Sequence, residues 1–532
     1  MNASTQTPAA PAAWHPMELS NTAKIAAFAT MCVGMFIALL DIQIVSASLR
    51  DIGGGLSAGA DETVWVQTSY LIAEIIVIPL SGWLSRVMST RWLFCASAAG
   101  FTLSSLLCGT AWNIQSMIAF RALQGFLGGS MIPLVFTTAF VFFTNKQRVI
   151  AAATIGAIAS LAPTLGPTVG GWITDHFSWH WLFFINLLPG LFIAVTVPML
   201  VKIDKPDLTL LRNADYPGML LMALFLGCLE YALEEGPRLD WLGDETILGC
   251  VWISALSGMG FIWRSLSYAH PIVDLRALKA RNFALGCFFS FITGVGIFAT
   301  IYLTPLFLGR VRGFSALDIG LAVFSTGVFQ ILAIPVYAMC ASRFDLRWLM
   351  MFGLSCFALS MWNFGPITHD WGGAQLLMPQ ALRGFGQQFA VAPTVVLSLG
   401  GLEQARLKLA SGLFNLMRNL GGAIGIAVCT TLLNNRTNLH FFRLAEQLNV
   451  RNEAMNDLLN GTSRIWMSMG SDSGGAQTSA LKQLWLLTYR EAQTQAFSDT
   501  FLAVMVCFAV ATLMVPLMHK FRPPREASPD AH

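Results

Sequence analysis

Residues 283–308 read FALGCFFSFITGVGIFATIYLTPLFL, a stretch without a single charged side chain. An α-helix needs about 20 apolar residues to cross the hydrocarbon core of a bilayer, so this stretch is long enough to span it. Only helices and closed barrels satisfy all backbone hydrogen bonds within lipid. The stretch therefore predicts a transmembrane helix, and the rest of the chain is interpreted from it.

Comparable apolar stretches occur on both sides of this one. They predict further spans near 24–47, 64–84, 92–112, 114–143, 149–174, 181–201, 216–233, 246–267, 316–341, 346–365, 373–399, 409–433 and 497–519. We therefore expect an all-α polytopic membrane protein with fourteen transmembrane helices.

The composition supports a membrane protein. Charged residues make up only 11% of the 532 residues, whereas soluble domains carry roughly 25%. A net charge of +3 gives no reason to expect a nucleic-acid partner. Ten scattered cysteines without a CxxC pair predict buried apolar thiols, not disulfides or a metal site. The segment before Lys24 lacks the basic start and cleavage site of a signal peptide, so a cytoplasmic tail and a retained first span are expected.

The basic residues predict the orientation. With the N-terminus inside, 19 of the 32 Lys and Arg residues fall on the cytoplasmic side, whereas the short outer loops carry four. Six lie in one long outer loop and three within spans. Cytoplasmic loops are enriched in Lys and Arg, so the bias predicts that both termini lie in the cytoplasm. We expect the protein to lie in the bacterial inner membrane.

Two short motifs repeat at an offset of about 260 residues, as expected for homologous halves. Ser85-Arg86 and Arg91-Trp92-Leu93 are echoed by Ser342-Arg343 and Arg347-Trp348-Leu349, and residues 120–126 (FRALQGF) are echoed by residues 382–387 (LRGFGQ). The repeat predicts a cytoplasmic tail (1–23), a six-helix half (24–202), two additional helices with linkers (203–282), a second six-helix half (283–521) and a cytoplasmic tail (522–532). A binding cavity would lie near the membrane midplane between the halves.

A few ionisable residues lie inside predicted spans, where they are costly unless they are paired or hydrated. Asp41, Glu74 and Arg121 belong to the first half and are our candidates for proton coupling. Burial favours the neutral form of a carboxylate, so such a group can take up a proton on one side and release it on the other. A static buried ion pair or a helix cap is the alternative interpretation.

Candidates for the substrate cavity are Tyr70, Glu230, Gln387, Asn415 and Arg418. Glu230 is the weakest functional candidate, because we expect the two inserted spans to lie outside the core of the two halves. Arg418 could equally serve packing. An acidic cavity would favour cations, whereas Arg383 or Arg418 facing the cavity would favour anions.

Glycine and proline mark residues 160–171 (SLAPTLGPTVGG) in the fifth predicted span. Gly166, Gly170 and the nearby Gly156 allow a close approach of neighbouring helices. Pro163 and Pro167 remove two backbone donors and bend a helix, and Gly171 completes the motif. A bent, tightly packed helix between the halves would seal one side of the cavity. A plain small-residue packing seam is the alternative.

Together these residues resemble the major facilitator superfamily, specifically its fourteen-span drug:proton antiporters of the EmrB/QacA type and their EmrB branch. The resemblance is carried by residues 40–45 (LDIQIV), Phe120-Arg121 through Gln124-Gly125, Leu165-Gly166-Pro167 through Gly170-Gly171, Trp179 to Asn186, and residues 414–422 (FNLMRNLGG). It implies the superfamily fold with two inserted helices, alternating access by rocking of the halves, and proton coupling at Arg121. The glycine-proline motif implies antiport.

One motif departs from the family. The loop between the second and third spans has Arg86 where the family has an aspartate and Ser89 where it has a glycine. The inner-gate charge contact of the family therefore cannot be carried over, and we expect Arg86 and Arg91 to anchor the positive side.

The resemblance also implies partners. The EmrB branch works with a periplasmic adaptor, an EmrA-like membrane fusion protein, and an outer-membrane channel. Residues 439–459 and 478–496 are polar and compatible with helices, so the outer loop 434–496 predicts a helical hairpin for such an adaptor. A flexible loop without a partner is the alternative.

We therefore expect a proton-coupled multidrug efflux transporter for hydrophobic or amphipathic small molecules, driven by the proton gradient without a cofactor. The alternative is an exporter of a specific metabolite, fatty acid or bile salt, because a scaffold does not fix a substrate. No H-E-x-x-H, G-x-S-x-G or P-loop motif occurs, so neither an enzyme nor an ATP-driven pump is expected.

Overall fold

The computed structural model describes residues 20–520, apart from 202, 213, 269–270, 403 and 449–451. All regular structure within this part of the chain is helical. The predicted tails, 1–23 and 522–532, lie outside the described residues except for residues 20–23.

The helices fall into three consecutive groups. The N-terminal half comprises α1 (Asn21–Ala47), α2 (Leu49–Gly55), α3 (Ala60–Val87), α4 (Thr90–Gly109), α5 (Ile114–Gly128), α6 (Met131–Phe142), α7 (Asn145–His176), α8 (Trp181–Phe184) and α9 (Leu187–Leu200). The inserted pair is α10 (Tyr216–Glu235) and α11 (Glu245–Ser267). The C-terminal half comprises α12 (Arg281–Arg310), α13 (Ala316–Ala341), α14 (Leu346–Asn363), α15 (Gly373–Leu399), α16 (Gln404–Gln447), α17 (Glu453–Ser468) and α18 (Ser473–Met514). Short 3₁₀ helices lie at Leu208–Leu211, Trp241–Gly243, Leu275–Lys279 and Val515–Leu517.

Each predicted span contains a helix or two consecutive helices. Twelve helical segments of the described chain are long and apolar enough to cross a membrane. The remaining two predicted spans, the eleventh and twelfth, correspond to α14 and α15, which pack along each other. Helix α14 has only 18 residues and begins with Leu346-Arg347, and α15 carries Arg383 and several glutamines. The arrangement is compatible with fourteen crossings.

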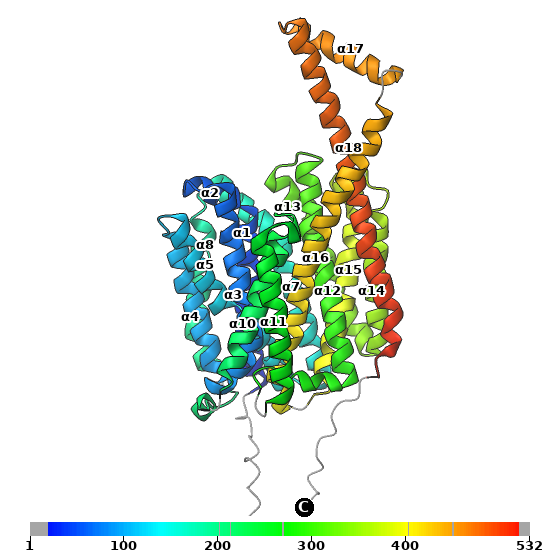
Figure 1. Cartoon of the computed structure of the whole chain (residues 1–532). Helices are drawn as coiled ribbons and strands as arrows, with labels where there is room; N and C mark the ends of the chain where they lie inside the picture. The colour runs from blue at the N-terminus through cyan, green and yellow to red at the C-terminus, as the bar shows by residue number, and fades with distance from the viewer. Residues whose placement is uncertain are drawn as a thin grey trace, which may run out of the picture.

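The two halves meet along two main seams. On one, α7 of the N-terminal half packs against α13 and α15; on the other, α3 and α6 pack against α16. The inserted helix α10 packs against both α3 and α16, and α11 packs against α10. Figure 1 shows this green pair standing at the front of the bundle. The inserted pair therefore contacts both halves, while most of its surface stays exposed, in agreement with the expected position outside their core.

Polar side chains fix the ends of the inserted pair. Asp215 caps α10 by accepting a hydrogen bond from the Gly218 backbone N–H (3.0 Å), and it also pairs with Arg264 near the end of α11. Asp244 caps α11 by accepting hydrogen bonds from the N–H groups of the second and third helical residues. Capping satisfies helix N–H groups that have no partner inside the helix.

An extension projects from one end of the bundle. The 44 residues of α16 and the 42 residues of α18 are each about twice as long as the hydrocarbon core requires. Figure 1 shows both helices rising beyond their neighbours, with α17 near the tip, whereas the start of α1 and the end of α18 lie at the opposite end. The segment 434–496 is thus built largely from continuations of two spans, with α17 between them.

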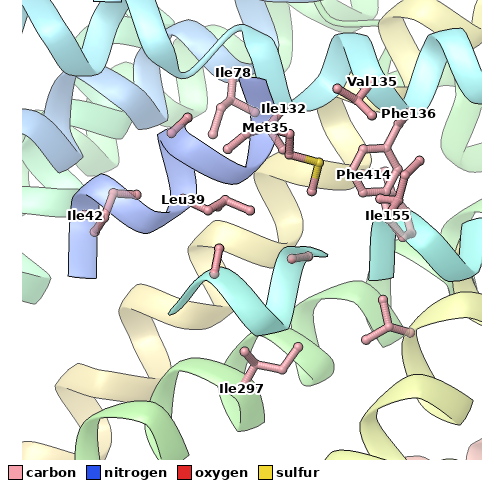
Figure 2. Close-up of a cluster of buried hydrophobic side chains, with 14 of the residues drawn as sticks. Met35, Leu39, Ile42, Ile78, Ile132, Val135, Phe136, Ile155, Ile297 and Phe414 are labelled. Carbon is pink, nitrogen blue, oxygen red and sulfur yellow. The ribbon is translucent and has the colours of Figure 1, made fainter. Parts of the chain in front are cut away.

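An apolar core joins the two halves next to the cavities described below. Figure 2 shows side chains from α1, α3, α6 and α7 gathered with side chains from α12 and α16. Phe136 of α6 and Phe414 of α16 meet there, with ring centroids 6.1 Å apart. The neighbouring hydroxyls of Thr137 and Ser411 lie 2.8 Å apart and form a hydrogen bond between the halves. The halves are therefore in contact at this level of the bundle.

Candidate functional site

A buried ion pair forms the centre of the N-terminal half. Asp41 of α1 and Arg121 of α5 are both fully buried, and the Arg121 Nη1 atom lies 2.6 Å from the Asp41 Oδ2 atom. The other carboxylate oxygen, Oδ1, accepts hydrogen bonds from the side-chain amides of Gln124 (3.2 Å) and Asn186 (2.7 Å). Three donors from α5 and the α8–α9 junction therefore hold this carboxylate, as a buried charge requires.

Arg121 is also fixed by α3. Its Nε donates to the Val66 carbonyl (3.1 Å), and its guanidinium lies over the Tyr70 ring, 4.3 Å from the ring centroid. Gly125, one turn along α5, sits against the Tyr70 backbone so closely that an added Cβ would lie 2.3 Å from the Tyr70 carbonyl oxygen. The Phe120–Phe126 motif thus supplies both the arginine and the close helix contact that positions it.

The third coupling candidate, Glu74, lies apart from this ion pair. It is 4% exposed and follows Tyr70 by one turn of α3. Within the described part of the chain it makes no hydrogen bond and no ion pair, but it lines a cavity of about 50 Å³. Of the three candidates, the structure joins Asp41 to Arg121 and places Glu74 at the wall of this small cavity.

This small cavity adjoins a larger one of about 510 Å³. The two share the lining residues Ile42, Leu71, Glu234, Phe298 and Ile426, which come from α1, α3, α10, α12 and α16. Both halves and the inserted helix therefore build the walls, as expected for a site between halves. The volume of the larger cavity falls in the range of small-molecule sites, roughly 300–1,000 Å³.

Of the five predicted cavity residues, only Glu230 lines either of these two cavities. Tyr70 instead packs under Arg121, and Asn415 donates to the Ser411 carbonyl of its own helix (2.9 Å). Arg418 places its guanidinium over the Phe136 ring, 5.7 Å from the centroid, and Gln387 is buried within α15. Because these residues are polar and lie inside predicted spans, the sequence indicated that they are buried. It did not indicate the direction in which their side chains point.

Several lining and network residues were not predicted individually. Glu234 lines both cavities and follows Glu230 by one helical turn, so the i, i+4 spacing could have indicated it. Gln124 and Asn186 lay within motifs that carried the family resemblance, but their contacts with Asp41 were not foreseen. Their distances from Asp41 in the sequence gave no signal.

The glycine-proline helix α7 is packed between α1 and α13. A Cβ added to Gly166 would lie 2.2 Å from the Gln43 Cβ, and one added to Gly170 would lie 2.8 Å from the Ile44 carbonyl oxygen. Both contacts are with the turn of α1 that follows Asp41. Pro163 and Pro167 lie inside the helix, Pro167 also lines the larger cavity, and the Gly171 carbonyl accepts a hydrogen bond from Thr174.

A charge contact does link the halves at the end opposite the extension, although not through the predicted loop. Lys408, at the start of α16, pairs with Asp204, in the linker after α9, and also donates to the Ser85 carbonyl (3.3 Å). Asp204 accepts a hydrogen bond from the Thr90 N–H (2.9 Å) at the start of α4. Arg86 is exposed and Arg91 lies over the Trp92 ring. A linker carboxylate therefore makes the contact between halves that the loop arginines do not make.

Comparison with known proteins agrees with this architecture. The Major Facilitator Superfamily model matches residues 31–426. The chain is 36% identical to the colistin resistance protein EmrB of Acinetobacter baumannii, over 92% of this chain and 95% of that protein. It is 30% identical to the fatty acid resistance protein FarB of Neisseria gonorrhoeae (95% and 98% covered) and 30% identical to the multidrug export protein EmrB of Escherichia coli K12 (86% and 91% covered).

Solved structures share the fold at low sequence identity. The proton:xylose symporter XylE superposes with a TM-score of 0.56 at 14% identity, covering 94% of this chain and 97% of that chain. The human organic anion transporter MFSD10 gives a TM-score of 0.54 at 13% identity, covering 91% and 99%. The family model matches most of the length of this chain, and the relatives include EmrB-type drug-resistance proteins. The chain therefore belongs to the major facilitator superfamily of membrane transporters.

Proposed function

We propose that this transporter exports hydrophobic or amphipathic compounds in exchange for protons, by rocking of its two halves around the cavities described above. The observation that carries the proposal is the fully buried Asp41–Arg121 pair, whose acidic member is held by three donors from α5 and the α8–α9 junction. The proton gradient would supply the energy without a cofactor, and no enzymatic reaction is expected.

Protonation of Asp41 would change these contacts. A neutral carboxyl group attracts Arg121 less, and its added proton needs an acceptor where Asn186 and Gln124 present donors. The turn of α1 beyond Asp41 packs directly on Gly166 and Gly170, so a shift of α1 would reach α7 and the seam with α13. Proton binding would thereby favour one arrangement of the halves over another.

Glu74 is our candidate for the coupled proton. It faces the small cavity without an ion-pair partner in the described chain, whereas Asp41 is held by Arg121. A carboxylate that faces a cavity can exchange protons with either side of the membrane as the cavity opens to one side and then to the other.

The test is substrate-induced proton release from proteoliposomes that contain the purified protein. We expect Glu74→Gln to abolish proton release while it retains substrate binding, because glutamine keeps the shape and loses the titratable group. Wild-type coupling in this variant would remove Glu74 from the mechanism. Glu62→Gln, at the exposed start of α3, is the matched control.

The extension supports a tripartite system that includes a periplasmic adaptor and an outer-membrane channel. It requires the inner-membrane orientation expected from the basic residues, with both termini in the cytoplasm. Helix α17 exposes Ile465 and Trp466, and the Met469 side chain beyond its end is also exposed, which gives an apolar surface far from the bundle. Unchanged drug export by whole cells after deletion of 440–490 would argue against an adaptor.

Export of a fatty acid or bile salt is the second candidate, favoured by the relative named as a fatty acid resistance protein. The three carboxylates that line the two cavities oppose it, because they disfavour an anionic head group. Growth of deletion and overexpression strains on a panel of cationic, neutral and anionic toxic compounds separates the candidates.

A further inference from the structure

Two carboxylates of the inserted helix α10 face the space between the halves. Glu230 lines the smaller cavity, and Glu234 lines both cavities. They are one helical turn apart and so lie on the same face of α10. Glu74 lines the smaller cavity from α3.

Glu230 is buried without a compensating partner in the described chain. It is 5% exposed, and its Oε2 atom has no hydrogen-bond partner among the described residues. A buried carboxylate is costly unless it is neutral or compensated. Two other buried acids nearby are compensated: Asp41 pairs with Arg121, and Glu235, the next residue after Glu234, pairs with Arg238 at 2.6 Å. The described protein supplies no such partner to Glu230.

The walls suit the apolar body of such a cation. Leu39, Ile42, Leu71 and Ile75 line the smaller cavity, and the rings of Phe298 and Tyr302 line the larger one. Aromatic faces attract organic cations. Among the described lining residues the single basic side chain is Arg310, at the end of α12.

Contacts on both sides hold α10 in this place. Tyr231 stacks on Trp65 of α3, with centroids 5.2 Å apart, and Arg238 pairs with Asp61. On the other side, Trp241 donates to the Thr431 hydroxyl of α16 (3.0 Å). The inserted helix is therefore joined to both halves next to the cavities.

We propose that Glu230 and Glu234 recognise the positive charge of amphipathic organic cations whose apolar part occupies the larger cavity. The inserted helix then determines which substrate charge is selected, while Asp41, Glu74 and Arg121 serve proton coupling. This inference rests on the proposed export function and names the substrate class of the same site.

The test compares two ions of nearly the same size and shape and of opposite charge, tetraphenylphosphonium and tetraphenylborate. Their binding to the purified full-length protein is measured by calorimetry in detergent without a proton gradient. We expect the wild type to prefer tetraphenylphosphonium, and Glu230→Gln to weaken its binding roughly tenfold or more without weakening tetraphenylborate binding. Glu234→Gln should act in the same direction and less strongly, because Glu234 is less buried.

Glu245→Gln removes the same charge from an exposed position on α11 and should leave both affinities unchanged. If Glu230→Gln does not fold, Glu234→Gln carries the comparison. Wild-type preference for tetraphenylborate, or equal loss of both ions in the glutamate variants, would overturn the inference. The binding measurement needs no proton gradient. It therefore shows which substrate charge the protein prefers even if the protein proved not to exchange protons.

Discussion

The two halves carry an arginine at matching positions of the sequence repeat, but the two arginines have different surroundings. Arg121 is paired with Asp41 and bonded to Gln124 and Val66. Arg383, 2% exposed, donates from Nη2 to the Thr326 hydroxyl (2.8 Å), and its Nε and Nη1 have no partner within the described chain. The arginine thus contacts a carboxylate in the N-terminal half and an uncharged hydroxyl in the C-terminal half.

The difference follows from the first helix of each half. Helix α1 carries Asp41, whereas α12 contains no acidic residue in Arg281–Arg310. A repeat of fold therefore does not require a repeat of chemistry. Among the described residues, the buried carboxylates belong to the N-terminal half and the inserted pair of helices with its N-cap.

The largest expected effect comes from breaking the charged pair. Asp41→Asn leaves Arg121 buried without its anion and turns an amide donor toward it, so the free energy of unfolding should fall by about 3–5 kcal/mol. Drug export should be lost as well. Chemical denaturation in detergent and an efflux assay measure the two effects.

Arg383→Gln is the matched control in the other half. It loses one hydrogen bond, worth about 1 kcal/mol, but also removes a buried charge without an anionic partner. We expect the free energy of unfolding to change by no more than about 1 kcal/mol. Equal destabilisation by the two variants would contradict the comparison.

The second prediction compares two glycines of α7, one packed within its own half and one packed against the other half. Gly166→Ala drives a methyl group into Gln43 of α1, within the N-terminal half, and should cost about 1–3 kcal/mol of stability. Gly156→Ala faces Val391 of the other half, where the nearest atom would be 3.3 Å away, and should cost less. Thermal unfolding of both variants checks the order, and the reverse order would refute it.

The third effect concerns the link between the halves at Lys408. The Lys408 and Asp204 side chains are 16% and 15% exposed, so Lys408→Gln should weaken closure at this end by about 1 kcal/mol. The rate is read from a cysteine introduced at buried Ser411. This cysteine should be alkylated several-fold faster in the Lys408→Gln variant than in the protein that carries Ser411→Cys alone. Lys482→Gln, on the exposed extension, should leave the rate unchanged. Equal rates in all three proteins would show that the ion pair does not hold the halves together.

The smallest effect compares the caps of two equivalent helices. The start of α4 receives Asp204 from a distant linker, whereas α14 is capped by its own Asp345, which bonds the Arg347 N–H (3.0 Å) and side chain. Partial burial raises the pKa of Asp345, but the hydrogen bonds and charge of Arg347 outweigh it and leave this pKa below its ordinary value.

A lowered folded-state pKa stabilises the protein above the unfolded-state pKa, about 3.9, and this stability is lost as pH falls through the folded value. Asp345→Asn keeps a capping oxygen but loses the charge that pairs with Arg347, so it should cost at most about 1 kcal/mol near pH 7. The difference from the wild type should narrow below about pH 4. Denaturation measured from pH 7 to pH 3 tests this, and a gap that widens toward low pH would give the opposite sign.

The sequence by itself determined the helices, their membrane-spanning character and the doubled plan. Apolar length, the distribution of Lys and Arg, and the 120–126 and 382–387 motifs are local or periodic signals, and lipid leaves few alternatives to a helix. The buried polar positions were also visible, because Asp41, Glu74 and Arg121 interrupt apolar stretches. Even the departure at Arg86 was a local signal.

Only the tertiary structure decided which of these residues meet. Asp41 and Asn186 are brought together by helix packing, and Asp204 reaches Lys408 across the two halves. The sequence indicated that the inserted spans lie outside the core, but only the packing of α10 against α3 and α16 shows that Glu230 and Glu234 line the cavities. The physical reason is that helical periodicity fixes which residues share a face, whereas the neighbour of that face depends on contacts between segments far apart in the chain.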